Sequence, residues 1–60
     1  MKPSFFSSRR AAINEANRRT KDTGQQHECY RQLGWLVRNQ VTKALIDADG
    51  TVLGYLLEGL

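Results

Sequence analysis

His27 and Cys29 carry the side chains that most often serve as base, nucleophile or metal ligand, and they lie two positions apart. This spacing places both side chains on one face of a β-strand but turns them about 200° apart on a helix. A catalytic cysteine–histidine pair also needs an orienting group and an oxyanion site, and no spacing in the sequence indicates either. We therefore expect that the protein has no catalytic residues and is not an enzyme.

A metal site is not indicated either. A structural zinc ion takes four ligands, and the chain's one cysteine and one histidine supply two, so such a site would need a second copy of the chain. Asp47, Asp49 and Gly50 resemble part of a calcium loop, but that alignment places Leu45 and Leu56 where carboxylates are required. Asp-Gly is typical of a tight hairpin turn, so we expect both carboxylates to be solvated. No metal, no cofactor and no small-molecule substrate are expected.

Basic residues gather in the first half of the chain. The net charge is +3, and residues 1–31 hold seven Lys and Arg against three Asp and Glu, whereas residues 32–60 hold two against three. Basic side chains bind phosphates, and asparagine can read an adenine edge in the major groove. The same charges could also form an ordinary solvated surface. The candidate nucleic-acid-binding residues are Arg10, Asn14, Asn17, Arg18, Lys21, Arg31 and Arg38.

Residues 9–21 are predicted to form a helix that carries most of these basic residues. The segment has no Gly or Pro, Ser7 or Ser8 precedes it as an N-cap, and Gly24 follows as a stop. Phe6 could close a hydrophobic staple over the first turn. The helix must pack on a larger apolar surface because its own apolar stripe is small, consisting of Ala12, Ile13, Ala16 and Thr20.

Residues 26–40 fit two structures, a second helix or a pair of strands. As a helix, the segment would have an apolar and a polar side, but Gly34 in its interior would cost about 1 kcal/mol relative to alanine. As strands, arms 27–32 and 35–40 pair around a two-residue turn of Leu33 and Gly34, which suits the glycine, and we favour this structure. In that register one face carries Tyr30, Trp35 and Val37, and the other carries His27, Cys29, Arg31, Leu36, Arg38 and Gln40.

Residues 43–57 are predicted to form a β-hairpin around Asp49 and Gly50. One face of it collects Ala44, Ile46, Ala48, Leu53 and Tyr55, and the other collects Lys43, Leu45, Asp47, Val52 and Leu56. The predicted fold is α+β, a single domain over residues 1–60 in which the N-terminal helix packs on a small antiparallel β-sheet. The helix is expected to cover the face that holds Tyr30, Trp35, Ile46 and Leu53. The alternative is a mainly helical fold with two or three helices.

The chain is too short to bury a large core. A domain of 60 residues buries about 60% of the surface that its unfolded chain exposes. The uncharged run over residues 52–57 is far shorter than the ~20 residues that cross a membrane, but it suits an edge strand that pairs with another strand. We therefore expect a protein partner, a self-dimer or both. The candidate interface consists of Leu45, Val52, Leu56, Leu57 and Leu60.

These features predict a small interaction protein, an adaptor or inhibitor that binds another protein. The alternative is a small basic protein that binds nucleic acid through the cationic face of the N-terminal helix. The single cysteine cannot form a disulfide within the chain, so a cytoplasmic location is expected.

Overall fold

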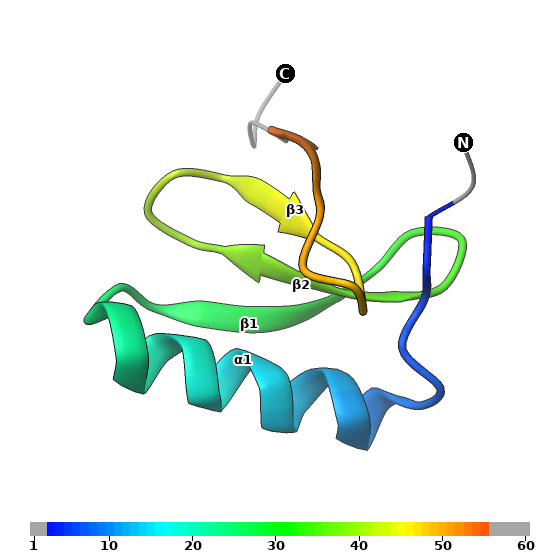
Figure 1. Ribbon diagram of the computed structural model, residues 1–60, viewed down its shortest axis with the longest axis horizontal. Coiled ribbons are helices and arrows are strands. Elements are labelled where there is room, and N and C mark those ends of the chain that lie inside the picture. The colour runs from blue at the N-terminus through cyan, green and yellow to red at the C-terminus, as the bar shows by residue number, and fades with distance from the viewer. Residues whose placement is uncertain (1–2, 56–60) are drawn as a thin grey trace.

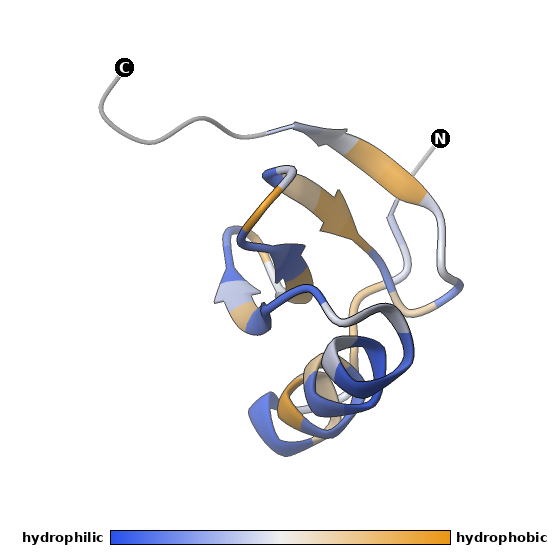
Figure 2. Ribbon diagram, turned by 90° about the vertical axis from the view of Figure 1, so that its left-hand side faces the viewer, coloured by the Kyte–Doolittle hydropathy of each residue, from blue (hydrophilic) through white to orange (hydrophobic). Residues whose placement is uncertain are grey.

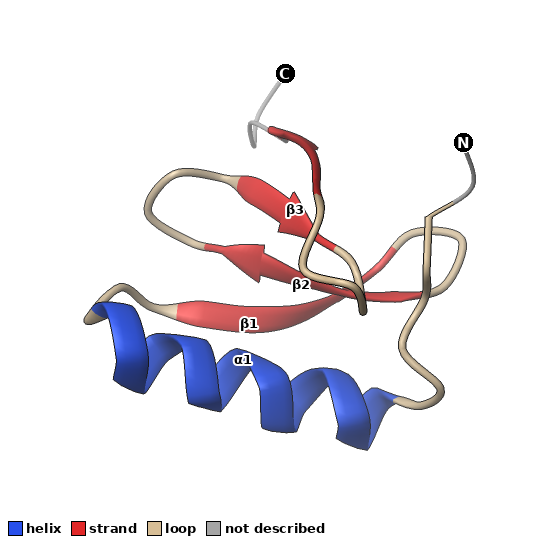
Figure 3. Ribbon diagram, viewed as in Figure 1, coloured by secondary structure: helices blue, strands red, loops and turns tan. Residues whose placement is uncertain are grey.

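The computed structural model describes residues 3–55, which form one helix and a four-stranded antiparallel sheet (Figure 1). The helix α1 (Arg9–Thr23) is followed by the strands β1 (His27–Arg31), β2 (Trp35–Asn39), β3 (Ala44–Ile46) and β4 (Val52–Tyr55). The strands lie side by side in chain order, and each pairs with the next through a short connection (Figure 3). The α+β prediction is confirmed, and the mainly helical alternative is not supported.

The helix α1 begins at Arg9, as the sequence predicts, and extends two residues past the predicted end at Lys21 before Gly24 stops it. The Ser8 hydroxyl oxygen accepts a hydrogen bond from the Ala11 N–H at 3.2 Å, which caps the first turn. Gly24 adopts a φ of 74°, and its N–H donates to the Thr20 carbonyl, which is a conformation that glycine adopts without strain. Ala12 and Ala16 are buried against the sheet, as expected. Their small side chains allow the helix backbone to approach the strands closely.

The β1–β2 register differs by one residue from the predicted one. Arg31 pairs with Trp35, so the connection contains three residues, 32–34, in place of the predicted two. The Gln32 N–H donates to the Gly34 carbonyl at 3.2 Å, and the Phe5 ring fills the space that a Cβ on Gly34 would occupy. Phe5 and Gly34 are far apart in the sequence, so local turn preferences did not reveal their contact.

This shift redistributes the predicted faces, because side chains alternate along a strand. Val37 lies on the face toward α1, where it forms the core with Ala16, Ile46 and the half-buried Phe6. The β1 residues that share this face are His27, Cys29 and Arg31, which were expected on the other one. Tyr30, Leu36 and Arg38 lie on the opposite face, so the prediction that α1 covers Tyr30 is wrong.

The β3–β4 hairpin forms, with Asp49 and Gly50 inside a five-residue connection, residues 47–51, in place of the predicted tight turn. Two of its three strand pairs match the predicted register. Ala44 pairs with Tyr55 and Leu45 with Gly54, as the sequence indicates, but Ile46 then pairs with Val52 because a β-bulge intervenes. A bulge adds one unpaired residue and increases the local twist. The helix α1 packs on β1 and β2, and within residues 3–55 it does not reach β4.

Asp47 is buried, which corrects the expectation that it is solvated. Its Oδ1 accepts hydrogen bonds from the N–H groups of Asp49, at 3.0 Å, and Thr51, at 2.9 Å. Its Oδ2 accepts one from the Ser4 N–H at 3.2 Å. Burial acts to raise the pKa of the Asp47 carboxyl, but these backbone donors outweigh it and hold the pKa below its usual value. Asp47 therefore joins the hairpin turn to the N-terminal segment.

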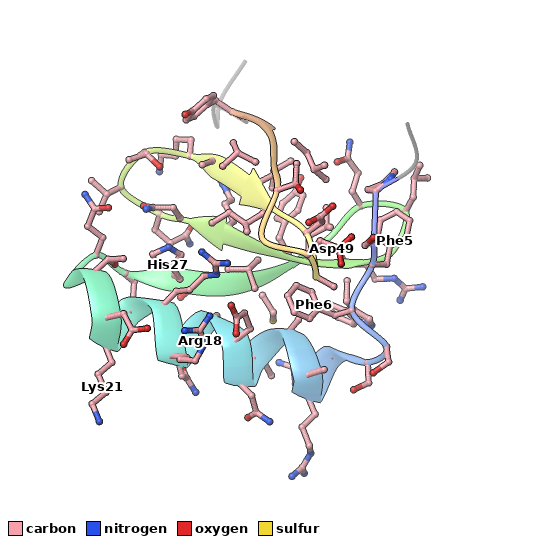
Figure 4. The ribbon with its side chains drawn as sticks, viewed as in Figure 1. Phe5, Phe6, Arg18, Lys21, His27 and Asp49 are labelled. Atoms are coloured by element: carbon pink, nitrogen blue, oxygen red, sulfur yellow. The ribbon has the colours of Figure 1, made fainter. Side chains whose placement is uncertain are left out.

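Residues 4–6 run along the sheet before α1 begins. The Phe6 N–H donates to the Trp35 carbonyl at 2.9 Å, and the Ser4 carbonyl accepts from the Ala48 N–H. Phe5 and Phe6 thus hold the start of α1 against β2 (Figure 4). No helix within residues 3–55 is long and apolar enough to cross a membrane.

Candidate functional site

The strand β4 forms one edge of the sheet and exposes apolar side chains. It pairs with β3, and the part of the chain that the structure describes places no strand on its other side. Val52, Leu53 and Tyr55 are 49%, 42% and 68% exposed. Figure 2 shows this hydrophobic strand at the end of the sheet farthest from α1. The backbone groups of an edge strand and three apolar side chains together form a surface on which another strand can pair.

The predicted interface residues divide into three groups. Val52 lies on the exposed β4 edge, as proposed from the sequence. Leu45 is 8% exposed and therefore lies inside the described fold, where it pairs with Gly54. The remaining three residues lie outside the described residues, namely Leu56, Leu57 and Leu60. Sequence reasoning missed Leu53 and Tyr55, because it assumed that α1 covers the whole of one face.

A second candidate surface is the side of α1 that faces away from the sheet. Arg10, Asn14, Asn17 and Lys21 are exposed there, and Figure 4 shows Lys21 directed away from the strands. Within residues 3–55, neither Arg10 nor Lys21 forms an ion pair. This surface, defined by these four residues, is called the α1 polar surface below.

Arg18 belongs to the same side of α1, but its charge is matched by two carboxylates. It donates two hydrogen bonds to Glu15, at 2.9 and 2.6 Å, and one to Asp22 at 3.0 Å. The Arg18 contact is the main cause that lowers the pKa of Glu15, burial opposes it, and Arg19 adds to the lowering. The same contact raises the pKa of Arg18. Arg18 is therefore less free to bind phosphate than the sequence suggested.

Arg31 and Arg38 do not lie together on one open face. The Arg31 side chain is exposed on the α1 face, with its guanidinium 5.6 Å from the centre of the Trp35 ring. Arg38 lies on the opposite face, is 4% exposed, and has its guanidinium 5.7 Å from the centre of the Tyr30 ring. The one-residue register shift separates them, since Arg31 pairs with Trp35 and Arg38 with Glu28.

A third candidate is a groove of about 350 Å³ between α1 and β1. His27 and Cys29 share its strand side, as the spacing predicts for a strand (Figure 4 shows His27 beside α1). The His27 Nδ1 donates to the Gln25 carbonyl at 2.7 Å, so a backbone group holds the position that a carboxylate occupies in a catalytic triad. Within residues 3–55, no three His, Cys, Asp or Glu side chains are placed to hold a metal ion.

Comparison of the chain with models of protein families, with curated proteins and with solved structures finds no match. Its function is therefore inferred from its own surfaces.

Proposed function

We propose that this protein is a small interaction module that binds another protein by adding a strand of its partner to β4. The observation that carries this proposal is the exposed edge, with Val52, Leu53 and Tyr55 each more than 40% exposed on a strand of four residues. An added strand would pair with the free backbone groups of β4 and remove these side chains from water.

The size of the fold supports the same proposal. The helix α1 covers β1 and β2, so the apolar surface of β4 lacks an intramolecular cover within the described residues. Apolar surface gains about 25 cal/mol for each Å² removed from water, and a small domain has little stability to spare. A partner on β4 would therefore stabilise the fold as well as assemble a complex, and a second copy of the chain would serve in the same way.

The first test compares Val52→Lys with Thr51→Lys. Val52 lies in β4, whereas the exposed Thr51 immediately precedes it, so the two variants add the same charge at adjacent positions. A lysine on an edge strand disfavours pairing with another strand. We expect Val52→Lys to weaken self-association or capture of an isolated partner about tenfold, and Thr51→Lys to leave them unchanged.

Light scattering reports self-association, and pull-down followed by titration of the purified partner reports binding. Circular dichroism checks that both variants keep the fold. If wild type and both variants associate equally, β4 is not the interface and the proposal fails.

The α1 polar surface supports a second candidate function, the binding of nucleic acid. Arg10 and Lys21 are exposed and form no ion pair with the described residues, so both can neutralise phosphates. Asn14 and Asn17 lie on the same surface and can donate hydrogen bonds to phosphates or bases.

Salt dependence tests this candidate. Two phosphate contacts give a slope of about −1.8 in log K against log salt, so affinity for generic duplex DNA should fall about sevenfold between 50 and 150 mM salt. Arg10→Glu combined with Lys21→Glu should abolish binding in a fluorescence anisotropy titration. Lys43→Glu, in the connection between β2 and β3, is the control for charge. Absence of binding at 50 mM salt would eliminate this candidate.

A further inference from the structure

The second edge of the sheet is β1, and it borders the groove between α1 and the strand. The groove opens to solvent, and an apolar floor is formed by Ile13 and Ala16 from the helix and by Cys29 from the strand. The polar residues that line the groove are Arg9 and Asn17 from α1 and Gln26, His27 and Glu28 from the other side.

The hydrogen-bond pattern shows which backbone groups of β1 are free. The Gln40 N–H donates to the Gln26 carbonyl at 2.8 Å, and the Gln32 N–H donates to the Gly34 carbonyl at 3.2 Å. In an antiparallel ladder, hydrogen-bonded pairs recur at every second residue, so the even-numbered residues of β1 bond to β2. The N–H and C=O groups of Cys29 and Arg31 therefore point away from β2.

The His27 backbone directly supports the assignment that odd-numbered residues of β1 do not bond to β2. Its N–H donates to the Thr20 hydroxyl of α1 at 2.8 Å and not to β2. The same bond shows that the end of α1 lies along this edge of β1. Beyond His27, residues 3–55 place no strand against the edge, so Cys29 and Arg31 present backbone donors and acceptors for one more strand.

The charge at one end of the groove is unbalanced. The helix runs antiparallel to β1, so Arg9 at the start of α1 lies toward the end of β1, where Arg31 is (Figure 1). Neither arginine forms an ion pair with the described residues. Glu28, which also lines the groove, lies farther from this end and accepts a hydrogen bond from the Gln40 side chain at 2.8 Å. A ligand with an acidic group at the Arg9 end would complement this charge.

We propose that the groove binds an extended acidic peptide of a partner protein, which pairs with β1 as a fifth strand. Side chains on one face of a strand recur at every second residue, about 7 Å apart. The bound segment would place an apolar side chain over Ile13 and Cys29, and an Asp or Glu two positions away beside Arg9 and Arg31. This peptide site is separate from the β4 surface and goes beyond the proposed function.

The test uses a fluorescein-labelled peptide of eight residues in which threonine and valine alternate and the last valine position is glutamate. We expect saturable binding by fluorescence anisotropy, and about tenfold weaker binding of the matched peptide with lysine in place of glutamate. The N–H groups of alternate peptide residues face β1, and those of the residues between them face away. N-methylation of the set that faces β1 should abolish binding, and N-methylation of the other set should leave binding unchanged.

Two pairs of variants locate the site on the full chain. Arg31→Glu should weaken binding about tenfold, and Lys43→Glu, with the same change in charge, should not. Cys29→Pro removes an N–H that points away from the ladder, a position where an edge strand tolerates proline, and should abolish binding. Cys29→Ala keeps the N–H and removes only the thiol from the groove floor, so it should weaken binding far less than Cys29→Pro. If Cys29→Pro does not fold, the methylated peptides and Arg31→Glu decide.

Several results would overturn the proposal. Equal binding of the glutamate and lysine peptides would exclude the charge complementarity, and binding that tolerates both methylation patterns would exclude strand pairing. Displacement of the peptide by single-stranded oligonucleotide at equal concentration would assign the groove to nucleic acid. Loss of binding in Val52→Lys would place the peptide on β4, which would support the proposed function while the groove proposal fails.

Discussion

Replacement of Asp47 by alanine should lower the free energy of unfolding by about 3 kcal/mol. The carboxylate accepts hydrogen bonds from three backbone N–H groups, those of Ser4, Asp49 and Thr51. Alanine would leave these donors without their partner at a site that is 4% exposed. A domain of this size is stable by about 3–9 kcal/mol, so the loss would unfold a substantial fraction of the molecules.

Urea unfolding followed by circular dichroism measures this loss, and two matched variants sharpen it. Asp47→Asn keeps one acceptor oxygen but not the charge, and should cost about 1–2 kcal/mol. Asp49→Ala removes an exposed carboxylate whose side-chain partner is the Ser4 hydroxyl, and should change stability by less than about 1 kcal/mol. Equal losses for Asp47→Ala and Asp49→Ala would contradict the role assigned to Asp47.

Asp47 should also contribute to the pH dependence of stability. Because the backbone donors hold its folded-state pKa below the ordinary value of 3.8, the stabilisation is complete above pH 3.8. It is lost as the pH falls through the lower folded-state pKa. The difference in stability between wild type and Asp47→Ala should therefore be constant near neutral pH and shrink in strong acid. A difference that grows toward acid pH would contradict the lowered pKa.

Replacement of Ala16 by leucine should lower the free energy of unfolding by about 2 kcal/mol. Ala16 is 2% exposed and packs against Val37 and Ile46, so the larger side chain must push α1 away from the sheet. Asn14→Leu adds leucine at an exposed position of the same helix and should change stability by less than about 0.5 kcal/mol. If Ala16→Leu is as stable as the wild type, α1 can move away from the sheet without a loss of stability, and this prediction is wrong.

The elements of this fold could be predicted because local signals specify them. Ser8 and Gly24 cap a segment without helix breakers, and Asp49 with Gly50 marks the turn of the last hairpin. Gly34 favoured a turn over a second helix, and the structure agrees. Each signal acts within a few residues, so a single sequence was sufficient to read it.

The register of β1 and β2 could not be predicted in the same way. The extra turn residue accompanies a contact between Phe5 and Gly34, which lie 29 positions apart. A shift of one residue moves every side chain of a strand to the other face. That shift separated Arg31 from Arg38 and placed Cys29 and Arg31 on the face toward α1, where Cys29 lines the groove, which the sequence did not indicate.

The candidate binding surfaces were predicted in part. Val52 and the exposed polar side of α1 follow from hydropathy and from helical periodicity, respectively. The burial of Leu45 and the exposure of Leu53 and Tyr55 depend on how far α1 extends across the sheet. Pairing of Arg18 with Glu15 and Asp22 follows the helical spacing of three and four residues, a signal that charge counting alone overlooks.

The contacts of residues 4–6 affect the order in which the chain can fold. Ser4 bonds to the side chains of Asp47 and Asp49, 43 and 45 positions further along. A chain emerging from the ribosome therefore cannot form the Ser4 bonds until the hairpin turn has also been synthesised. Contacts at such separation slow folding and make it a single late step, so we expect the native state to form after translation of this region and not during it.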